Sequence, residues 1–177
     1  MDLRSQDGNG NLSTSPTLAI ERIRKSEDRA QAIVFFLFFS RLEYALKRMG
    51  FAGESGEARA DWQKYAQEHP DLLGKTKDER LKQAVAHLKE SPPKKQIVSN
   101  GHLDWADDHF TGIFDLTRVL TLICRIRNNL FHGGKFTCGE ELDISRDRKL
   151  LDAGLTIMQA LLDQDNQLRH LFMEKLE

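Results

Sequence analysis

The stretch from Thr17 to Met49 restricts the fold more than any other part of the chain, because it contains neither glycine nor proline. Proline removes a backbone donor and glycine adds conformational freedom, so both interrupt helices. Their absence allows one long helix or two abutting helices, and Gly50 supplies a terminator. The run AIVFFLFF (32–39) is apolar on every side of such a helix. We expect this helix either to be buried within a bundle or to pack against a second copy of the protein.

Helix breakers and apolar periodicity divide the rest of the chain into further segments. They predict four more helices, over about Glu57–Glu68, Lys77–Glu90, Phe110–Leu130 and Arg146–Lys175. Residues 91–109 mix breakers with charges and are expected to form an irregular connection, and residues 133–145 a polar turn or short hairpin. The predicted fold class is therefore all-α, a helical bundle of four main helices with accessory helices and turns.

The composition bounds the domain organisation and the setting of the protein. A chain of 177 residues is long enough for one domain, which we place at residues 15–177 after a polar, disordered tail at residues 1–14. The longest apolar run has eight residues, against the roughly 20 that a membrane-spanning helix needs, and the first residues lack an apolar signal core. Two cysteines are too few for a disulfide framework. We expect a cytoplasmic protein that does not cross a membrane.

The predicted helix over 110–130 carries an arginine on its apolar face. Steps of three and four residues place on one inward stripe Ile113, Leu116, Leu120, Ile123, Arg127 and Leu130. A charged residue on such a stripe is costly unless it is paired or lines a cleft. The same periodicity assigns to a different, wetter face Arg118, Leu122, Arg125 and Asn129.

Positive charge is concentrated around this helix end, although the whole chain has a net charge of −1. The stretch from Leu116 to Gly139 contains no Asp or Glu, and its four basic residues are Arg118, Arg125, Arg127 and Lys135. A partner that is a polyanion would therefore meet a local basic patch and not a basic protein.

The segment RNNLFHGG (127–134) resembles the motif of HEPN domains (higher eukaryotes and prokaryotes nucleotide-binding). Those domains are bundles of four to five helices whose motif lies at the end of the third core helix, and the residue after the Arg is commonly Asn, as Asn128 is here. The segment FFSRLEYALKRMGF (38–51) is similar to their first core helix. Some members carry, two residues after the His, a Tyr that a partner enzyme modifies. This chain departs from that pattern at Gly134.

The resemblance implies a metal-independent endoribonuclease that needs no cofactor and cuts RNA in a cleft between two protomers of a homodimer. Attack by the RNA's own 2′-OH would give a 2′,3′-cyclic phosphate and a 5′-OH. The implied catalytic residues are Arg127, His132 and Asn128, and the implied substrate-binding residues are Arg125, Lys135, Arg118 and Glu43. A toxin or defence effector is the expected role, with an antitoxin or sensor protein as a further partner.

Plainer interpretations stand beside these expectations. The alternative function is a non-catalytic HEPN module that binds nucleotides, RNA or protein. His132 could be a helix-end cation, and Arg127 could form an ion pair with Glu43 or Asp152. Glu43 and Arg41 could lie on a solvated face. The spacing alone is weak, since Arg80 and His87 also fit it.

A metal site is not expected in the connection between the predicted helices. Its cluster of potential ligands comprises His102, Asp104, Asp107, Asp108 and His109. Their spacing matches no established metal motif, and we interpret them as an acidic loop.

Overall fold

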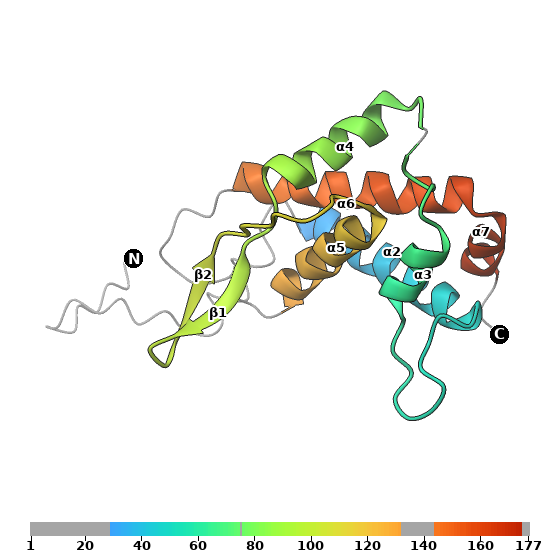
Figure 1. Ribbon diagram of the computed structural model, residues 1–177, viewed down its shortest axis with the longest axis horizontal. Helices are drawn as coiled ribbons and strands as arrows, with labels where there is room; N and C mark the ends of the chain where they lie inside the picture. Colours follow the sequence, from blue (N-terminus) through green and yellow to red (C-terminus); the bar gives the residue numbers. More distant parts are fainter. Residues whose placement is uncertain (1–28, 75, 132–143, 175–177) are drawn as a thin grey trace, which may run out of the picture.

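The computed structural model describes residues 29–74, 76–131 and 144–174, and helices dominate them (Figure 1). The elements in chain order are α2 (Arg29–Arg48), α3 (Trp62–Glu68), α4 (Glu79–Glu90), β1 (Lys95–Ser99), β2 (His102–Ala106), α5 (Leu116–Phe131), α6 (Ile144–Gln164) and α7 (Asn166–Met173). The predicted all-α class is confirmed in its main feature, since the two strands form one small hairpin beside the bundle.

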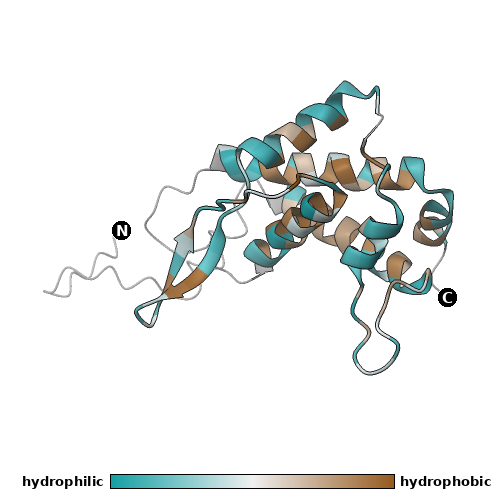
Figure 2. Cartoon of the chain, viewed as in Figure 1, coloured by the Kyte–Doolittle hydropathy of each residue, from teal (hydrophilic) through white to brown (hydrophobic). Residues whose placement is uncertain are grey.

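The long helices α2, α5 and α6 lie against one another and enclose the core, and the shorter helices pack around them. Helix α4 runs along α6, α3 packs on α5, and α7 contacts both α2 and α6 (Figure 1). Apolar residues gather where these helices face one another, with polar residues outward (Figure 2). Fully buried side chains at the centre include Phe35, Leu42, Leu46, Leu120, Leu122, Ile123, Ile157 and Leu161.

Several helix ends follow local capping signals. Gly50 adopts φ +91° two residues after Arg48, where α2 ends, which confirms its predicted role as the terminator of that helix. The side chain of Asp78 accepts a hydrogen bond from the backbone N–H of Arg80 (2.9 Å), so α4 begins at Glu79. Asp61 caps α3 in the same way through the N–H of Lys64 (2.9 Å).

Three predicted helices differ from the structure because of such caps. The helix predicted over about Glu57–Glu68 begins only at Trp62, directly after its cap Asp61. Helix α5 begins at Leu116 and not at Phe110, because Asp115 accepts a hydrogen bond from the N–H of Arg118 (2.9 Å). Ile113 therefore lies before the helix and is 83% exposed, so its assignment to the inward stripe was wrong. The predicted helix over 146–175 is divided at Asp165, whose extended backbone and side chain cap α7 through the N–H of Leu168 (2.9 Å).

The connection predicted to be irregular contains a β-hairpin, so that prediction was wrong. Strands β1 and β2 pair antiparallel, with Gln96 opposite Trp105 and Val98 opposite Leu103. Asn100 and Gly101 form the two-residue turn, with φ of +50° and +80°. An Asn-Gly pair between two apolar runs is a strong hairpin signal, because both central residues of this turn need positive φ.

Three expectations lie outside the described residues. These are the tail at residues 1–14, the first part of the long helix before Arg29, and the turn or hairpin at 133–145, of which only Ile144 and Ser145 are described, as the first residues of α6. Among the helices that the structure does describe, each is too short or too polar to cross a lipid bilayer.

Candidate functional site

Arg127 lies in the last turns of α5 and faces α2. Its guanidinium carbon is 5.6 Å from the centroid of the Phe39 ring, a cation–π distance. Its Nη1 donates a hydrogen bond to Oδ1 of Asn128 (2.9 Å). The predicted inward position of Arg127 is confirmed, since its side chain is half-buried and continues the stripe of buried Leu120 and Ile123. Two of the three predicted catalytic residues are therefore in contact.

An open pocket of about 120 Å³ lies beside Arg127. Its lining combines this one cation with apolar side chains of α2 and α5, namely Ala32, Phe35, Phe36 and Leu130. A guanidinium keeps its charge in such surroundings and presents a planar set of donors that matches phosphate oxygens. The pocket therefore brings one guanidinium together with apolar side chains at the surface of the bundle.

Glu43 of α2 lies in the same region of the α2–α5 interface. Burial, together with the charge of Glu43, raises the pKa of the Cys124 thiol to about 12, although the charge of Arg127 acts in the opposite direction. Glu43 is half-buried, so its predicted solvated position is only partly correct. The thiol of Cys124 is therefore protonated at neutral pH and is no candidate nucleophile.

Asp152 was the other suggested ion-pair partner of Arg127. Its carboxylate accepts a hydrogen bond from the side chain of Gln31.

Arg41 does not face the candidate site. Its Nε donates to the backbone carbonyl of Phe172 (2.8 Å), and Nη2 donates to the carbonyls of Leu171 (3.3 Å) and Glu174. These are carbonyls at the end of α7, where a cation is favourable. Arg41 therefore fastens α7 to α2.

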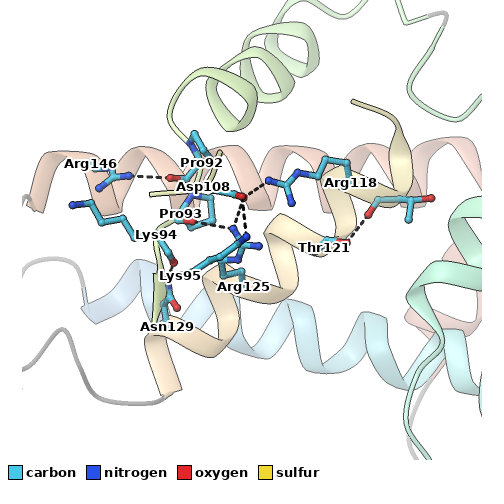
Figure 3. Close-up of polar contacts among 11 residues, drawn as sticks. Pro92, Pro93, Lys94, Lys95, Asp108, Arg118, Thr121, Arg125, Asn129 and Arg146 are labelled. Atoms are coloured by element: carbon cyan, nitrogen blue, oxygen red, sulfur yellow. Dashed lines mark hydrogen bonds and ion pairs between the residues drawn. The ribbon is translucent and has the colours of Figure 1, made fainter. Parts of the chain in front are cut away.

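Asp108 is the centre of an ion cluster that sequence reasoning missed (Figure 3). Its carboxylate is 2% exposed and accepts hydrogen bonds from Arg118 Nη2 and Arg125 Nη1, with Lys95 Nζ at 3.3 Å. Burial alone would raise the pKa of Asp108, but the hydrogen bonds from Arg125 and Arg118 outweigh burial and lower it to about 2. The stretch of α5 without acidic residues was the available signal, since buried cations require a carboxylate from elsewhere in the chain.

The predicted wetter face of α5 is in fact covered, and that prediction was wrong. Leu122 is fully buried, Arg118 is 9% exposed and Asn129 is 7% exposed. The two ends of the hairpin segment, at Pro93–Lys94 and at Asp108, lie against this face of the helix (Figure 3). Periodicity identifies apolar stripes, but it cannot show that a polar face is covered by a distant segment.

Three successive backbone carbonyls before the hairpin bind side chains of α5 and α6 (Figure 3). The carbonyl of Pro92 accepts from Arg146 (2.9 Å), that of Pro93 from Arg125 (3.2 Å), and that of Lys94 from Asn129 (3.0 Å). These bonds hold the last turns of α5 against the hairpin base. Arg125 and Asn129 therefore help to position the helix end that carries Arg127.

His132 and Lys135, one predicted catalytic and one predicted substrate-binding residue, lie outside the described residues. His132 follows Phe131, the last residue of α5, in the sequence. Within the part of the chain that the structure describes, no group of three or more His, Cys, Asp or Glu side chains could hold a metal ion. Of the suspected acidic loop, His102–Ala106 form β2 and Asp108 forms the ion cluster.

Comparison of the chain with protein-family models, with curated proteins and with solved structures finds no match.

Proposed function

We propose that this protein is a metal-independent endoribonuclease of the HEPN type, with Arg127, Asn128 and His132 as catalytic residues. The observation that carries the proposal is the position of Arg127, half-buried at the inward end of α5, bonded to Asn128 and lining an open pocket. Helix capping does not require a cation at this inward position, because a capping cation can lie on the solvated side. Binding of an anionic substrate would account for a cation at this position.

The proposed reaction uses the nucleophile that RNA itself carries. His132 accepts the proton of the 2′-OH, and the 2′ oxygen forms a bond to phosphorus while the bond to the 5′ oxygen breaks. The leaving 5′ oxygen takes a proton from the partner's His132, which is protonated before the step. Imidazole suits both transfers, since its ordinary pKa is about 6.5. Arg127 stabilises the negative charge that develops on the phosphate oxygens. The products are a 2′,3′-cyclic phosphate and a 5′-OH.

A two-fold homodimer would bring two His132 and two Arg127 residues to one cleft. Helix α2 supports this part of the proposal, because it exposes large apolar side chains next to the pocket. The exposed fractions are 44% for Ile33, 53% for Val34 and 60% for Leu37. Monomeric proteins seldom leave such contiguous apolar surface in water. The role as a toxin or defence effector, with an antitoxin or sensor partner, belongs to the same proposal.

Purified protein incubated with total RNA in EDTA tests this function. We expect fragments that end in a 2′,3′-cyclic phosphate, and we expect no fragments from His132→Ala or Arg127→Ala that remain folded by circular dichroism. Arg80→Ala is the matched control, because Arg80 also precedes a histidine at motif spacing but lies exposed on α4. Cleavage by both folded variants at the normal rate would exclude the proposed roles.

The rival function is a non-catalytic HEPN module that binds a nucleotide, RNA or protein. One observation favours it, because Arg118 and Arg125 already bind Asp108 and so contribute less positive charge to an RNA surface. RNA that the protein binds in a gel-shift assay but does not cut in the cleavage assay would identify this binding function.

A further inference from the structure

The pocket beside Arg127 is more apolar than the binding of a phosphate alone requires. Four of its five lining residues are apolar, and two of these are the aromatic residues Phe35 and Phe36. Proteins hold phosphate groups with lysine, arginine, hydroxyl and backbone N–H donors, and apolar side chains add nothing to such a contact. A ligand that fills this pocket must therefore have an apolar part next to its negative charge.

Phe36 is the aromatic residue of the lining that a ligand can reach. It is 36% exposed, whereas Phe35 and Phe39 of the same helix are 0% and 2% exposed. Phe35 and Phe39 belong to the core, where their rings stack with centroids 6.3 Å apart. Phe36 therefore presents an aromatic surface at the pocket that the packing of the core does not require.

Arg127 and Leu130 line the pocket from α5. They are three residues apart, so they lie on the same side of that helix. The guanidinium of Arg127 is held by its hydrogen bond to Asn128 (2.9 Å) and by its position over the Phe39 ring (5.6 Å). An anion that Arg127 binds in this pocket would thus lie beside the apolar surface of Phe36 and Leu130.

A nucleotide combines the two parts that this lining selects. Its phosphate oxygens accept hydrogen bonds from a guanidinium, and its base offers a flat face that stacks on aromatic side chains. In RNA each phosphate lies between two nucleosides, so a base can reach Phe36 while the neighbouring phosphate contacts Arg127. Charge and shape together favour a nucleotide unit over a purely apolar partner.

We propose that Phe36 stacks on a nucleobase next to the phosphate that Arg127 binds. This inference rests on the proposed ribonuclease function and adds to it a substrate-binding residue from α2. The stacking contact is equally present in the bound RNA and in the transition state, so its loss should raise KM and leave kcat unchanged. Because every base has a π face, the pocket should require that a base is present more than it selects which base.

Binding of two uncleavable oligonucleotides to the full chain, measured by fluorescence anisotropy, tests the proposal. One is a 2′-O-methyl uridine octamer, and the other has the same backbone and charge but no bases. We expect the octamer with bases to bind about tenfold or more tightly. Equal affinities would overturn the proposal, and would fit a pocket that a side chain of a second copy fills. Binding of neither oligonucleotide would overturn it as well.

Substitutions of Phe36 separate stacking from general apolar contact. Phe36→Leu keeps an apolar side chain but removes the flat ring, so the preference for the octamer with bases should fall about fivefold or more, whereas Phe36→Trp should retain it. Phe110→Leu is the matched control, because Phe110 is 44% exposed but lies before α5 and outside this pocket. An unchanged preference in folded Phe36→Leu would contradict the stacking contact.

Photo-crosslinking gives a test that needs no variant. A 5-bromouridine in the 2′-O-methyl octamer should crosslink to Phe36 of the wild-type chain, with the site located by mass spectrometry. Crosslinks that occur only in other segments would overturn the proposal.

The cleavage assay distinguishes failure of this inference from failure of the proposed function. If the base preference depends on Phe36 but RNA is never cut, the ribonuclease function fails and the stacking contact stands. If wild-type protein and Phe36→Leu cut RNA with the same KM, the ribonuclease function stands and the stacking contact fails.

Discussion

Asp108 and Arg125 are separated by the loop that leads into α5 and by the first half of that helix, yet the Arg125 guanidinium donates to the Asp108 carboxylate in a largely buried cluster. This contact divides the roles of two neighbouring arginines. Arg125 ties α5 to the segment before and after the hairpin, whereas Arg127 lines an open pocket on the opposite side of the helix. The two arginines should therefore respond differently to the same substitution.

Replacement of Arg127 should abolish RNA cleavage. We expect Arg127→Ala to lower the single-turnover rate on the order of 100-fold or more, because it removes a donor from the charge that develops at the phosphate. Arg127→Lys should also be poor, since an ammonium group cannot reproduce the planar fork of donors. The opposite ranking, with Arg125→Ala inactive and Arg127→Ala active, would mean that the motif uses its longer spacing to His132.

Replacement of Arg125 should mainly destabilise the fold. Arg125→Ala removes the hydrogen bonds to Asp108 and to the Pro93 carbonyl, so the free energy of unfolding in urea should fall by about 1–3 kcal/mol. Arg59→Ala, at an exposed ion pair, should cost less than about 1 kcal/mol. If Arg125 instead contacts RNA, the variant should retain its stability and bind RNA with a smaller salt dependence, by about one unit of slope.

The Asp108 cluster predicts a specific dependence of stability on pH. The pKa of Asp108 is lowered from its ordinary 3.8 to about 2, so the charged carboxylate stabilises the folded state above pH 3.8. This contribution, about 2 kcal/mol, should be lost as the pH falls from about 4 toward 2. In urea unfolding, Asp108→Asn should have a lower free energy of unfolding than the wild-type protein at pH 7. This difference should shrink as the pH falls from about 4 toward 2. A deficit that is constant with pH would exclude the linkage.

Tyr65 and Asp165 form a second buried polar contact, with the phenol donating to Oδ2 at 3.1 Å. Burial and the charge of Asp165 raise the pKa of Tyr65, so the phenol should remain protonated until the protein unfolds in alkali. Tyr65→Phe should reduce the free energy of unfolding by about 1 kcal/mol. Asp165→Ala should cost more, because it also removes the N-cap of α7. Equal losses of unfolding free energy in Tyr65→Phe and Asp165→Ala would contradict the additional capping role of Asp165.

The exposed face of α2 should mediate self-association. Leu37 is 60% exposed, so Leu37→Asp should leave the circular dichroism spectrum unchanged but convert a dimer to a monomer by light scattering. Val98→Asp on the hairpin is the matched control, since Val98 is 70% exposed but lies away from α2. A wild-type protein that is monomeric at micromolar concentration would remove the two-fold cleft from the proposed mechanism.

The features that could be predicted from the sequence depend on residues near one another in the chain. Breaker positions predicted the helical class and the end of α2 at Gly50, and periodicity predicted that Arg127 faces inward. Local signals were also present for the hairpin at Asn100–Gly101, and for the cap at Asp165 that divides the last predicted helix. The candidate catalytic trio likewise follows from one short segment.

Only the tertiary structure decided what covers the second face of α5 and which charges are already paired. Asp108 reaches Arg118 and Arg125 because the hairpin returns the chain across that helix, and Asn129 binds the carbonyl of Lys94 for the same reason. Periodicity along a helix reports the apolarity of each face, but a polar face is buried whenever a distant carboxylate or carbonyl satisfies it. That partner is selected by packing between segments far apart in the chain, and for this reason the sequence by itself left Arg125 on a solvated surface.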